Sequence, residues 1–271
     1  MTAPLGIAHF TTIKVPPTDF ARMAARIGYS AIGLRLNPAF PGAPTYEIGV
    51  GTAAMRDMKS ILKTEGTGVH DIEFLVIDGT FVPESFLKTL ESAGELSAKR
   101  LSVCGDDADG ARLRSNIARL ADLAQPFGIG IDIENMPWRK ISTFSQAVAL
   151  AKDCGAPNVS ALVDALHFTR GGAVPGDLKA IAPEFVKSFQ LCDAASARPA
   201  TNDALIAEAR GGRRLPGEGT LPLVELLDAA PNDCSLSVEV PLTTGTAEEH
   251  ARAVFDAAQN IIARSSVRRN I

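Results

Sequence analysis

Apolar residues along this chain follow two alternating spacings. Short runs of consecutive apolar positions, such as Ile131–Ile133 and Ala161–Val163, are separated by longer stretches in which apolar side chains recur every three or four positions. Consecutive apolar positions are typical of strands buried on both faces, whereas the wider spacing is typical of helices with one buried face. The pattern predicts eight strands. They are Ile7–Ile13, Ala31–Leu36, Val69–Ile77, Arg100–Gly105, Ile129–Glu134, Ser160–Asp164, Phe185–Leu191 and Ser235–Val240.

Helical patterns follow the predicted strands from one end of the chain to the other. Thr143 with Gln146, and Thr246 with Glu249, form capping boxes that start a helix. No linker interrupts the alternation, so we predict one domain over residues 1–271. Alternating strands and helices indicate an α/β fold, and eight such units fit a single (β/α)8 TIM barrel, which takes about 250 residues. A doubly wound parallel sheet is the alternative.

The composition and charge of the chain argue against a membrane span and against nucleic-acid binding. The chain has 46% hydrophobic residues, a net charge of −4 and no apolar run near the ~18 residues of a membrane span. Its negative charge argues against a large nucleic-acid surface. The N-terminal segment has no basic stretch ahead of an apolar run, so we expect no signal peptide and a cytoplasmic protein. The four cysteines are too widely spaced for a Cys-x-x-Cys site and are expected to be reduced thiols.

Four predicted strands end in a side chain that carries an oxygen atom. In a barrel, the carboxyl ends of the strands meet at the mouth, where active sites lie. An acidic residue after a strand is also a common helix N-cap, but Glu is a poor cap. We therefore predict that the four side chains converge at the mouth. They are Glu134, Asp164, Gln190 and Glu239.

The predicted cluster suits a hard divalent cation. Three carboxylates and an amide oxygen match Mn²⁺ or Mg²⁺, with Co²⁺ as a further option. Zn²⁺ is less expected, because it normally takes His or Cys ligands. One histidine is near in sequence, His167, which follows Asp164 by three positions.

Five segments, in this order and spacing, carry a family resemblance. They are Ile133–Trp138, Leu162–His167, Phe189–Ala194, Leu215–Gly219 and Ser237–Pro241. Together they resemble the xylose isomerase-like barrel superfamily, which includes sugar phosphate isomerases and epimerases, over nearly the whole chain. The resemblance implies that Glu134, Asp164, Gln190 and Glu239 hold the metal and that His167 contacts the substrate.

Gln190 departs from one branch of this superfamily and agrees with another. Sugar epimerases usually have His at this position. The segment Ser188–Ala194 instead resembles the 3-dehydroshikimate dehydratases, in which Gln is familiar. The resemblance therefore points to a superfamily and leaves the substrate open. Epimerases also often hold the substrate with an arginine soon after the seventh strand, where Arg198 is the nearest residue of that type.

The predicted chemistry begins with removal of a proton from a substrate carbon. Negative charge that develops next to a chelated carbonyl is stabilised by a divalent cation. Glu134 and Glu239, on strands well apart around the barrel, can flank the substrate and act as catalytic acid and base. His167 can donate to a substrate oxygen, or it can orient Asp164 by a hydrogen bond. The following step distinguishes epimerisation, isomerisation and dehydration, and the sequence leaves it open.

Further side chains are predicted to shape the substrate site. Arg35, at the end of the second strand, either binds an anionic group or forms a structural ion pair. Trp138 is expected to form an apolar wall or to anchor a loop. The long connection 192–234 has a length typical of a lid. Three of its arginines, those just before the Pro-Gly-Glu-Gly turn, are interpreted as solvated, with an anion site as the alternative. They are Arg210, Arg213 and Arg214.

The leading hypothesis is a divalent-metal-dependent isomerase or epimerase that acts on a small sugar, keto-sugar or polyol derivative. A metal-dependent dehydratase of the 3-dehydroshikimate or inosose type is the alternative. Two hypotheses from other classes are a nuclease on abasic DNA and a non-catalytic sugar-binding barrel. The nuclease is disfavoured because its site uses many histidines and this chain has four. We expect a small carbohydrate-like partner and neither nucleic acid nor membrane, and the sequence is compatible with a homo-oligomer.

Overall fold

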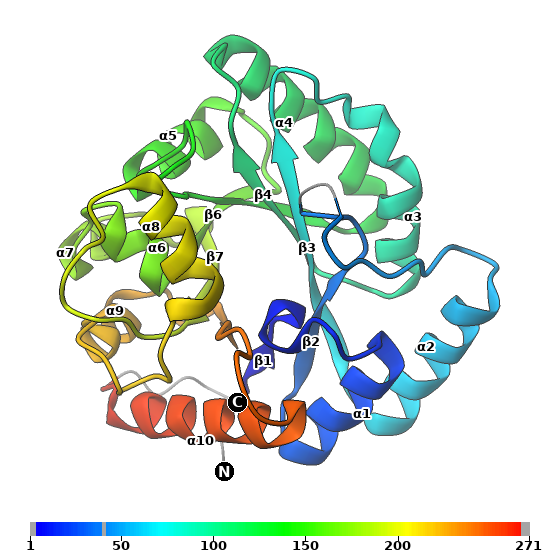
Figure 1. The fold of residues 1–271 in the computed structure, drawn as a ribbon. Coiled ribbons are helices and arrows are strands. Elements are labelled where there is room, and N and C mark those ends of the chain that lie inside the picture. The colour runs from blue at the N-terminus through cyan, green and yellow to red at the C-terminus, as the bar shows by residue number, and fades with distance from the viewer. Residues whose placement is uncertain (1–3, 40–41, 267–271) are drawn as a thin grey trace.

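Eight parallel strands close into a barrel in which each strand pairs with the next along the chain and β8 pairs with β1. The computed structural model describes residues 4–39 and 42–266, so both ends of the predicted domain lie outside the described residues. Figure 1 shows the helices as an outer ring around the strands. The predicted (β/α)8 TIM barrel is therefore confirmed. The strands are β1 (Gly6–Ile7), β2 (Ala31–Arg35), β3 (Gly68–Ile77), β4 (Arg100–Gly105), β5 (Gly130–Glu134), β6 (Val159–Asp164), β7 (Val186–Leu191) and β8 (Ser235–Val238).

The helices begin and end where the sequence supplies caps. Both predicted capping threonines accept a backbone N–H, Thr143 from Gln146 and Thr246 from Glu249, each at 3.3 Å. Gly28 ends the first helix in a left-handed conformation with φ 115°. The helices are α1 (Pro17–Ile27), α2 (Ala53–Glu65), α3 (Leu87–Glu95), α4 (Gly110–Ala124), α5 (Phe144–Asp153), α6 (Ala165–Arg170), α7 (Pro175–Lys179), α8 (Asn202–Ala207), α9 (Leu223–Ala229) and α10 (Ala247–Arg264). Among the described residues, no helix combines the length and apolar character needed to cross a membrane.

The first strand is much shorter than predicted. The strand expected over Ile7–Ile13 ends at Ile7, and His9–Thr12 forms a 3₁₀ helix instead. The carboxylate of Glu73 causes the change, because it accepts the backbone N–H groups of His9 and Phe10 at 2.5 and 3.2 Å. Those N–H groups are thus bound by a side chain of β3 and are not available to a strand ladder.

Strand register explains why four side chains from four strands share the barrel interior. Asp164 lies directly opposite Gln190, while Glu134 pairs with Leu162 and Gln190 pairs with Ser237. Asp164 lies two positions after Leu162, and Glu239 lies two positions after Ser237. Since side chains along a strand alternate with a period of two, offsets of zero or two keep all of them on one side of the sheet.

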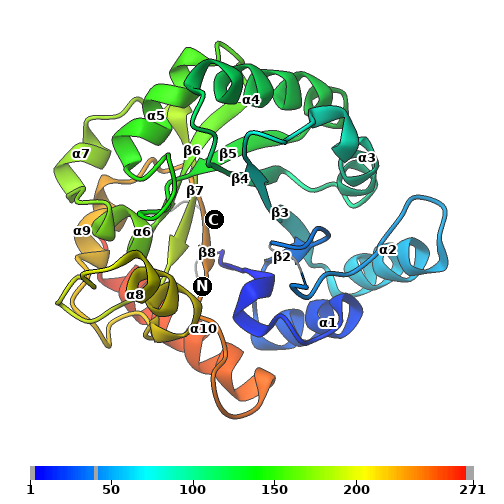
Figure 2. The same ribbon diagram turned by 45° about the horizontal axis from the view of Figure 1, so that its top comes forward.

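The connection between β7 and β8 folds into short helices, the first of which, α8, lies beside α6. It contains α8, a π-helical turn at Glu208–Gly212, and α9. Arg170 at the end of α6 forms two hydrogen bonds with Glu208, at 2.7 and 2.9 Å, which attach the turn to α6. Figures 1 and 2 both show α8 next to α6. π-helical turns are frequent near functional sites.

A polar cluster, which we call the base cluster, is buried inside the barrel on the amino-terminal side of the predicted site. Its members are Asp132, Arg100, Ser160, Ser188 and His70. Asp132 accepts a hydrogen bond from Arg100 and one from each of Ser160 and Ser188 at 2.5 Å. Burial alone would raise the pKa of Asp132, but Arg100 and the two serines outweigh burial and hold this pKa below its usual value.

Candidate active site

The predicted functional side chains line one pocket at the carboxyl end of the barrel. Those of Glu134, His167, Gln190 and Glu239 face it, and so do Arg35 and Trp138 from other loops and strands. Asp164 lies behind this wall and is fully buried. The structure thus brings these seven side chains together at the mouth of the barrel.

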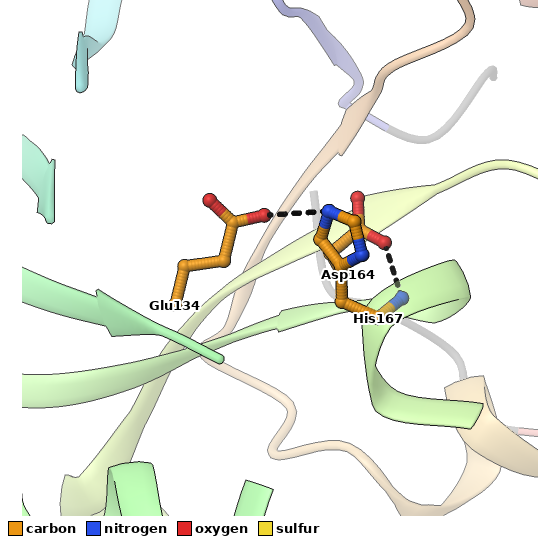
Figure 3. A group of neighbouring side chains, drawn as sticks. All are labelled: Glu134, Asp164 and His167. Atoms are coloured by element: carbon orange, nitrogen blue, oxygen red, sulfur yellow. Dashed lines mark hydrogen bonds and ion pairs between the residues drawn. The ribbon is translucent and has the colours of Figure 1, made fainter. Parts of the chain in front are cut away.

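Glu134, Asp164 and His167 form the innermost group. One potential ligand atom from each lies within 4.8 Å of the others. Figure 3 shows the ring of His167 between the two carboxylates, with Nε2 at 3.7 Å from Oε1 of Glu134. Asp164 accepts the backbone N–H of His167 at 2.9 Å and so caps α6. The capping interpretation therefore holds for Asp164, and its second oxygen is directed to a different partner.

That partner is Arg213, which sequence reasoning missed. Its Nη1 donates to Oδ2 of Asp164 at 2.5 Å, and its Nη2 lies 2.9 Å from Oε2 of Glu239. The side chain is 2% exposed. Interpreting the arginine cluster as solvated was wrong for Arg213. Arg210 and Arg214 are both exposed, as that interpretation expects, although Arg210 also lines the pocket.

Electrostatics in the pocket are dominated by crowded carboxylates. Burial, then Asp164 and Glu239, raise the pKa of Glu134 well above its usual value. Burial raises the pKa of Glu239 to about 7, although Arg213 opposes the shift. The cluster therefore carries more buried negative charge than its cation balances.

Arg213 keeps Asp164 ionised. Burial alone would raise the pKa of Asp164, but the nearby guanidinium outweighs burial and lowers it. His167 cannot supply this charge near neutral pH, because burial lowers its pKa to about 4. His167 is thus a neutral imidazole that can give or take one hydrogen bond. Asn135 fixes its backbone by donating to the His167 carbonyl at 3.0 Å.

The donor set fits a divalent cation. When Glu134, Asp164 and Glu239 are ionised, Arg213 leaves two negative charges, which one divalent cation would neutralise. The buried Oε1 of Gln190 has no hydrogen-bond partner among the described residues, and neither does Nδ1 of His167. Buried polar atoms are rarely left unpaired. Oxygen donors suit Mn²⁺, Mg²⁺ or Co²⁺, and His167 adds a nitrogen donor of the type that Zn²⁺ prefers.

Arg35 and Trp138 also line the pocket. Arg35 is buried, pairs with Glu73 at 3.1 Å and lies 4.8 Å from the ring centre of Phe10. Its Nε has no partner among the described residues, so the structural ion pair and a substrate contact are compatible. Trp138 meets the ring of His167 edge to face at 5.1 Å, as a pocket wall would.

Two histidines, and the Arg198 considered from the sequence, have structural partners outside the pocket. His9 is stacked between two aromatic rings, those of Phe20 and Tyr46. His70 belongs to the base cluster through Ser188. Arg198 donates to the carbonyl of Arg170 at 2.8 Å and is not among the residues that line the pocket.

Solved structures share this fold over almost the whole chain. The IolI protein with a bound zinc atom aligns with a TM-score of 0.79 at 17% identity, covering 98% of this chain and 100% of that one. The probable 3-DHS dehydratase AsbF from Bacillus anthracis aligns at 0.74 and 14%, covering 94% and 98%. A D-psicose 3-epimerase solved with D-fructose aligns at 0.69 and 19%, covering 96% and 97%. At these identities the likeness shows the fold alone.

Sequence comparison gives the family directly. No curated protein matches the chain. The family model named xylose isomerase-like TIM barrel matches residues 21–260, which is most of the sequence. The chain therefore belongs to the xylose isomerase-like TIM barrel family.

Proposed function

We propose that this protein is a divalent-metal-dependent isomerase or epimerase that acts on a small sugar, keto-sugar or polyol derivative. The observation that carries the proposal is the buried group of three carboxylates, from β5, β6 and the end of β8, in a pocket with the unpartnered amide oxygen of Gln190. Enzymes among the fold relatives, an epimerase and a probable dehydratase, support small carbohydrate-like substrates.

Glu134, Asp164, Gln190 and Glu239 would hold the metal. A bound divalent cation supplies positive charge that acidifies the C–H group next to a chelated carbonyl. Mn²⁺ and Mg²⁺ match the oxygen donors, and Zn²⁺ becomes a further candidate because His167 adds a nitrogen.

The two glutamates handle the proton. Glu134 ends β5 and Glu239 follows β8, so β6 and β7 separate them while both side chains face the same pocket. This separation allows them to flank a substrate. A carboxylate oxygen of one takes a proton from the substrate carbon, and the other returns a proton to the opposite face, which inverts the centre. Return of the proton to the neighbouring carbon gives aldose–ketose isomerisation instead.

The remaining residues hold the substrate. Neutral His167 places Nε2 beside Glu134, where it can bind a substrate hydroxyl group. Trp138 covers one side of the pocket and helps to exclude water. Arg35, with an unused Nε, binds an oxygen-rich group of the substrate at the far wall.

A dehydratase acting on a 3-dehydroshikimate-like or inosose-like substrate is the second candidate. Gln190 favours it, because this residue stands where the epimerase branch has His. The proton-abstraction step is the same, and the outcome differs in the loss of a β-hydroxyl group.

Deuterium wash-in separates the two candidates. The metal-loaded protein is incubated in D₂O with a panel of ketoses, inososes and 3-dehydroshikimate, and protein treated with a chelator is the blank. Deuterium next to the carbonyl without new absorbance from a conjugated product supports the isomerase or epimerase. Formation of a conjugated product would instead support the dehydratase and reject the isomerase or epimerase. The proposal is contradicted if neither exchange nor product is seen with any member of the panel when Mn²⁺, Mg²⁺, Co²⁺ and Zn²⁺ are each tried.

A further inference from the structure

The guanidinium group of Arg213 lies among atoms that the proposed metal ligands would offer. It contacts Oδ2 of Asp164 at 2.5 Å, Oε2 of Glu239 at 2.9 Å and Nε2 of His167 at 3.3 Å. Two of these residues are proposed ligands, and the third contributes an atom to the innermost group. The buried guanidinium therefore already neutralises part of the carboxylate charge that a metal ion would neutralise.

Arg213 is also fixed in position by two groups that are not proposed metal ligands. Its Nε donates to the carbonyl of Ala209 at 3.0 Å, within the π-helical turn, and its Nη1 lies 3.2 Å from Sγ of Cys192. Together with the two ion pairs, these contacts engage all three nitrogens of the guanidinium. The backbone of the π-helical turn thus sets the position of the charge.

The positive charge of Arg213 stabilises the metal-free site but disfavours metal binding. Three ionised carboxylates without it would leave three negative charges buried together, so Arg213 stabilises the metal-free site. The same positive charge repels a divalent cation that binds to the same carboxylates. Coulomb interactions between groups this close are strong in a buried setting.

We infer that Arg213 is a resident counter-cation of the metal centre. It holds Asp164 and Glu239 in place before the metal arrives, and it lowers the affinity for the metal so that the ion exchanges readily. Arg213 is a positioning residue, because it acts through these two carboxylates. The inference rests on the proposed metal site.

Two substitutions in the full-length chain test this role. Arg213→Met keeps an unbranched side chain and removes the charge, while Arg213→Lys keeps the charge and loses the fork that spans both carboxylates. Arg214→Met is the matched control, because Arg214 is the exposed neighbour whose Nη1 bonds only the carbonyl of Glu218 among the contacts described for its side chain. The readouts are the Kd for Mn²⁺ and Zn²⁺ by titration calorimetry and the Tm of the metal-free and metal-loaded protein.

We expect Arg213→Met to bind metal at least tenfold more tightly than the wild type and to lose several degrees of Tm in the metal-free form only. Arg213→Lys should fall between the wild type and Arg213→Met, and Arg214→Met should match the wild type. Weaker binding or an unchanged Kd in Arg213→Met overturns the inference. If that variant does not fold without metal, a Kd of Arg213→Lys at or above the wild-type value overturns it.

Failure of the proposed function is distinguishable from failure of this inference. A wild type that binds metal but turns over no substrate contradicts the function, while the ratio of Kd values still decides the role of Arg213. Metal binding by Arg213→Met alone supports the inference in its strongest form. If neither protein binds Mn²⁺ or Zn²⁺, both proposals are contradicted.

Discussion

Two buried polar clusters share the interior of this barrel, and they differ in how fully their atoms are paired. In the base cluster, both carboxylate oxygens of Asp132 accept hydrogen bonds, and Nε of Arg100 is its one fully buried side-chain atom without a partner among the described residues. At the mouth, two residues further along β5, the contact described for the Glu134 carboxylate is with a neutral histidine at 3.7 Å, and Oε1 of Gln190 has no hydrogen-bond partner within the described part of the chain.

The difference separates a structural role from a functional one. Buried polar networks that satisfy their own atoms stabilise and specify a core, whereas unpaired atoms and raised carboxyl pKa values are concentrated at functional sites. In the base cluster, the buried carboxylate of Asp132 is satisfied by side chains of the protein itself. The mouth becomes complete when a cation and a substrate are added.

The largest expected effect comes from the two glutamates at the mouth. Glu134→Gln and Glu239→Gln should each reduce turnover by about 10²–10⁴-fold, the usual contribution of a general acid or base, and should also weaken metal binding. Urea unfolding should show little loss of stability, because each change removes a crowded charge. Variants with unchanged metal content and activity would remove both glutamates from the proposed site.

The base cluster should respond in the opposite way. Asp132→Asn leaves the charge of Arg100 without its partner, which should lower the free energy of unfolding by about 3 kcal/mol, at the low end of values for broken buried pairs. Metal affinity measured on the folded fraction should stay near that of the wild type. Ser160→Ala, which removes one neutral donor to the same carboxylate, is a milder control at about 1 kcal/mol.

The two clusters should also give opposite slopes of stability against pH in the metal-free protein. Asp132 has a lowered pKa, so it stabilises the fold above the ordinary Asp pKa, and this contribution is lost as pH falls through the folded value. Glu239 has a pKa raised to about 7, so its contribution to stability falls as pH rises from the ordinary Glu value toward 7. Urea unfolding from pH 3 to 8 on the wild type, Asp132→Asn and Glu239→Gln measures both slopes. Each variant should lose the part of the slope that comes from its own carboxylate.

The smallest expected effect concerns the pocket wall. Trp138→Ala should raise KM by up to about tenfold, since an aromatic contact contributes about 0.5–1.5 kcal/mol, with a smaller change in kcat. Trp138→Phe should restore much of the difference. A loss confined to kcat would indicate that Trp138 acts through His167 and not as a wall.

Sequence reasoning located the mouth because its features are local. Strand period, chain order and the oxygen-bearing residues at strand ends were enough to place Glu134, Asp164, Gln190 and Glu239 on one side of the barrel. Arg213 was missed because its pairing with Asp164 joins residues 49 positions apart through a π-helical turn. The short first strand was missed for the same reason, since the carboxylate of Glu73 accepts the backbone N–H of His9, which is 64 positions away in the sequence.

Anomalous diffraction from a crystal soaked in Mn²⁺ tests the proposed metal centre most directly. We predict one strong peak at the mouth, about 2.0–2.6 Å from oxygens of Glu134, Asp164, Gln190 and Glu239, in the range of protein sites for hard cations. A peak elsewhere, or none at the mouth at a concentration that saturates binding in solution, would contradict it.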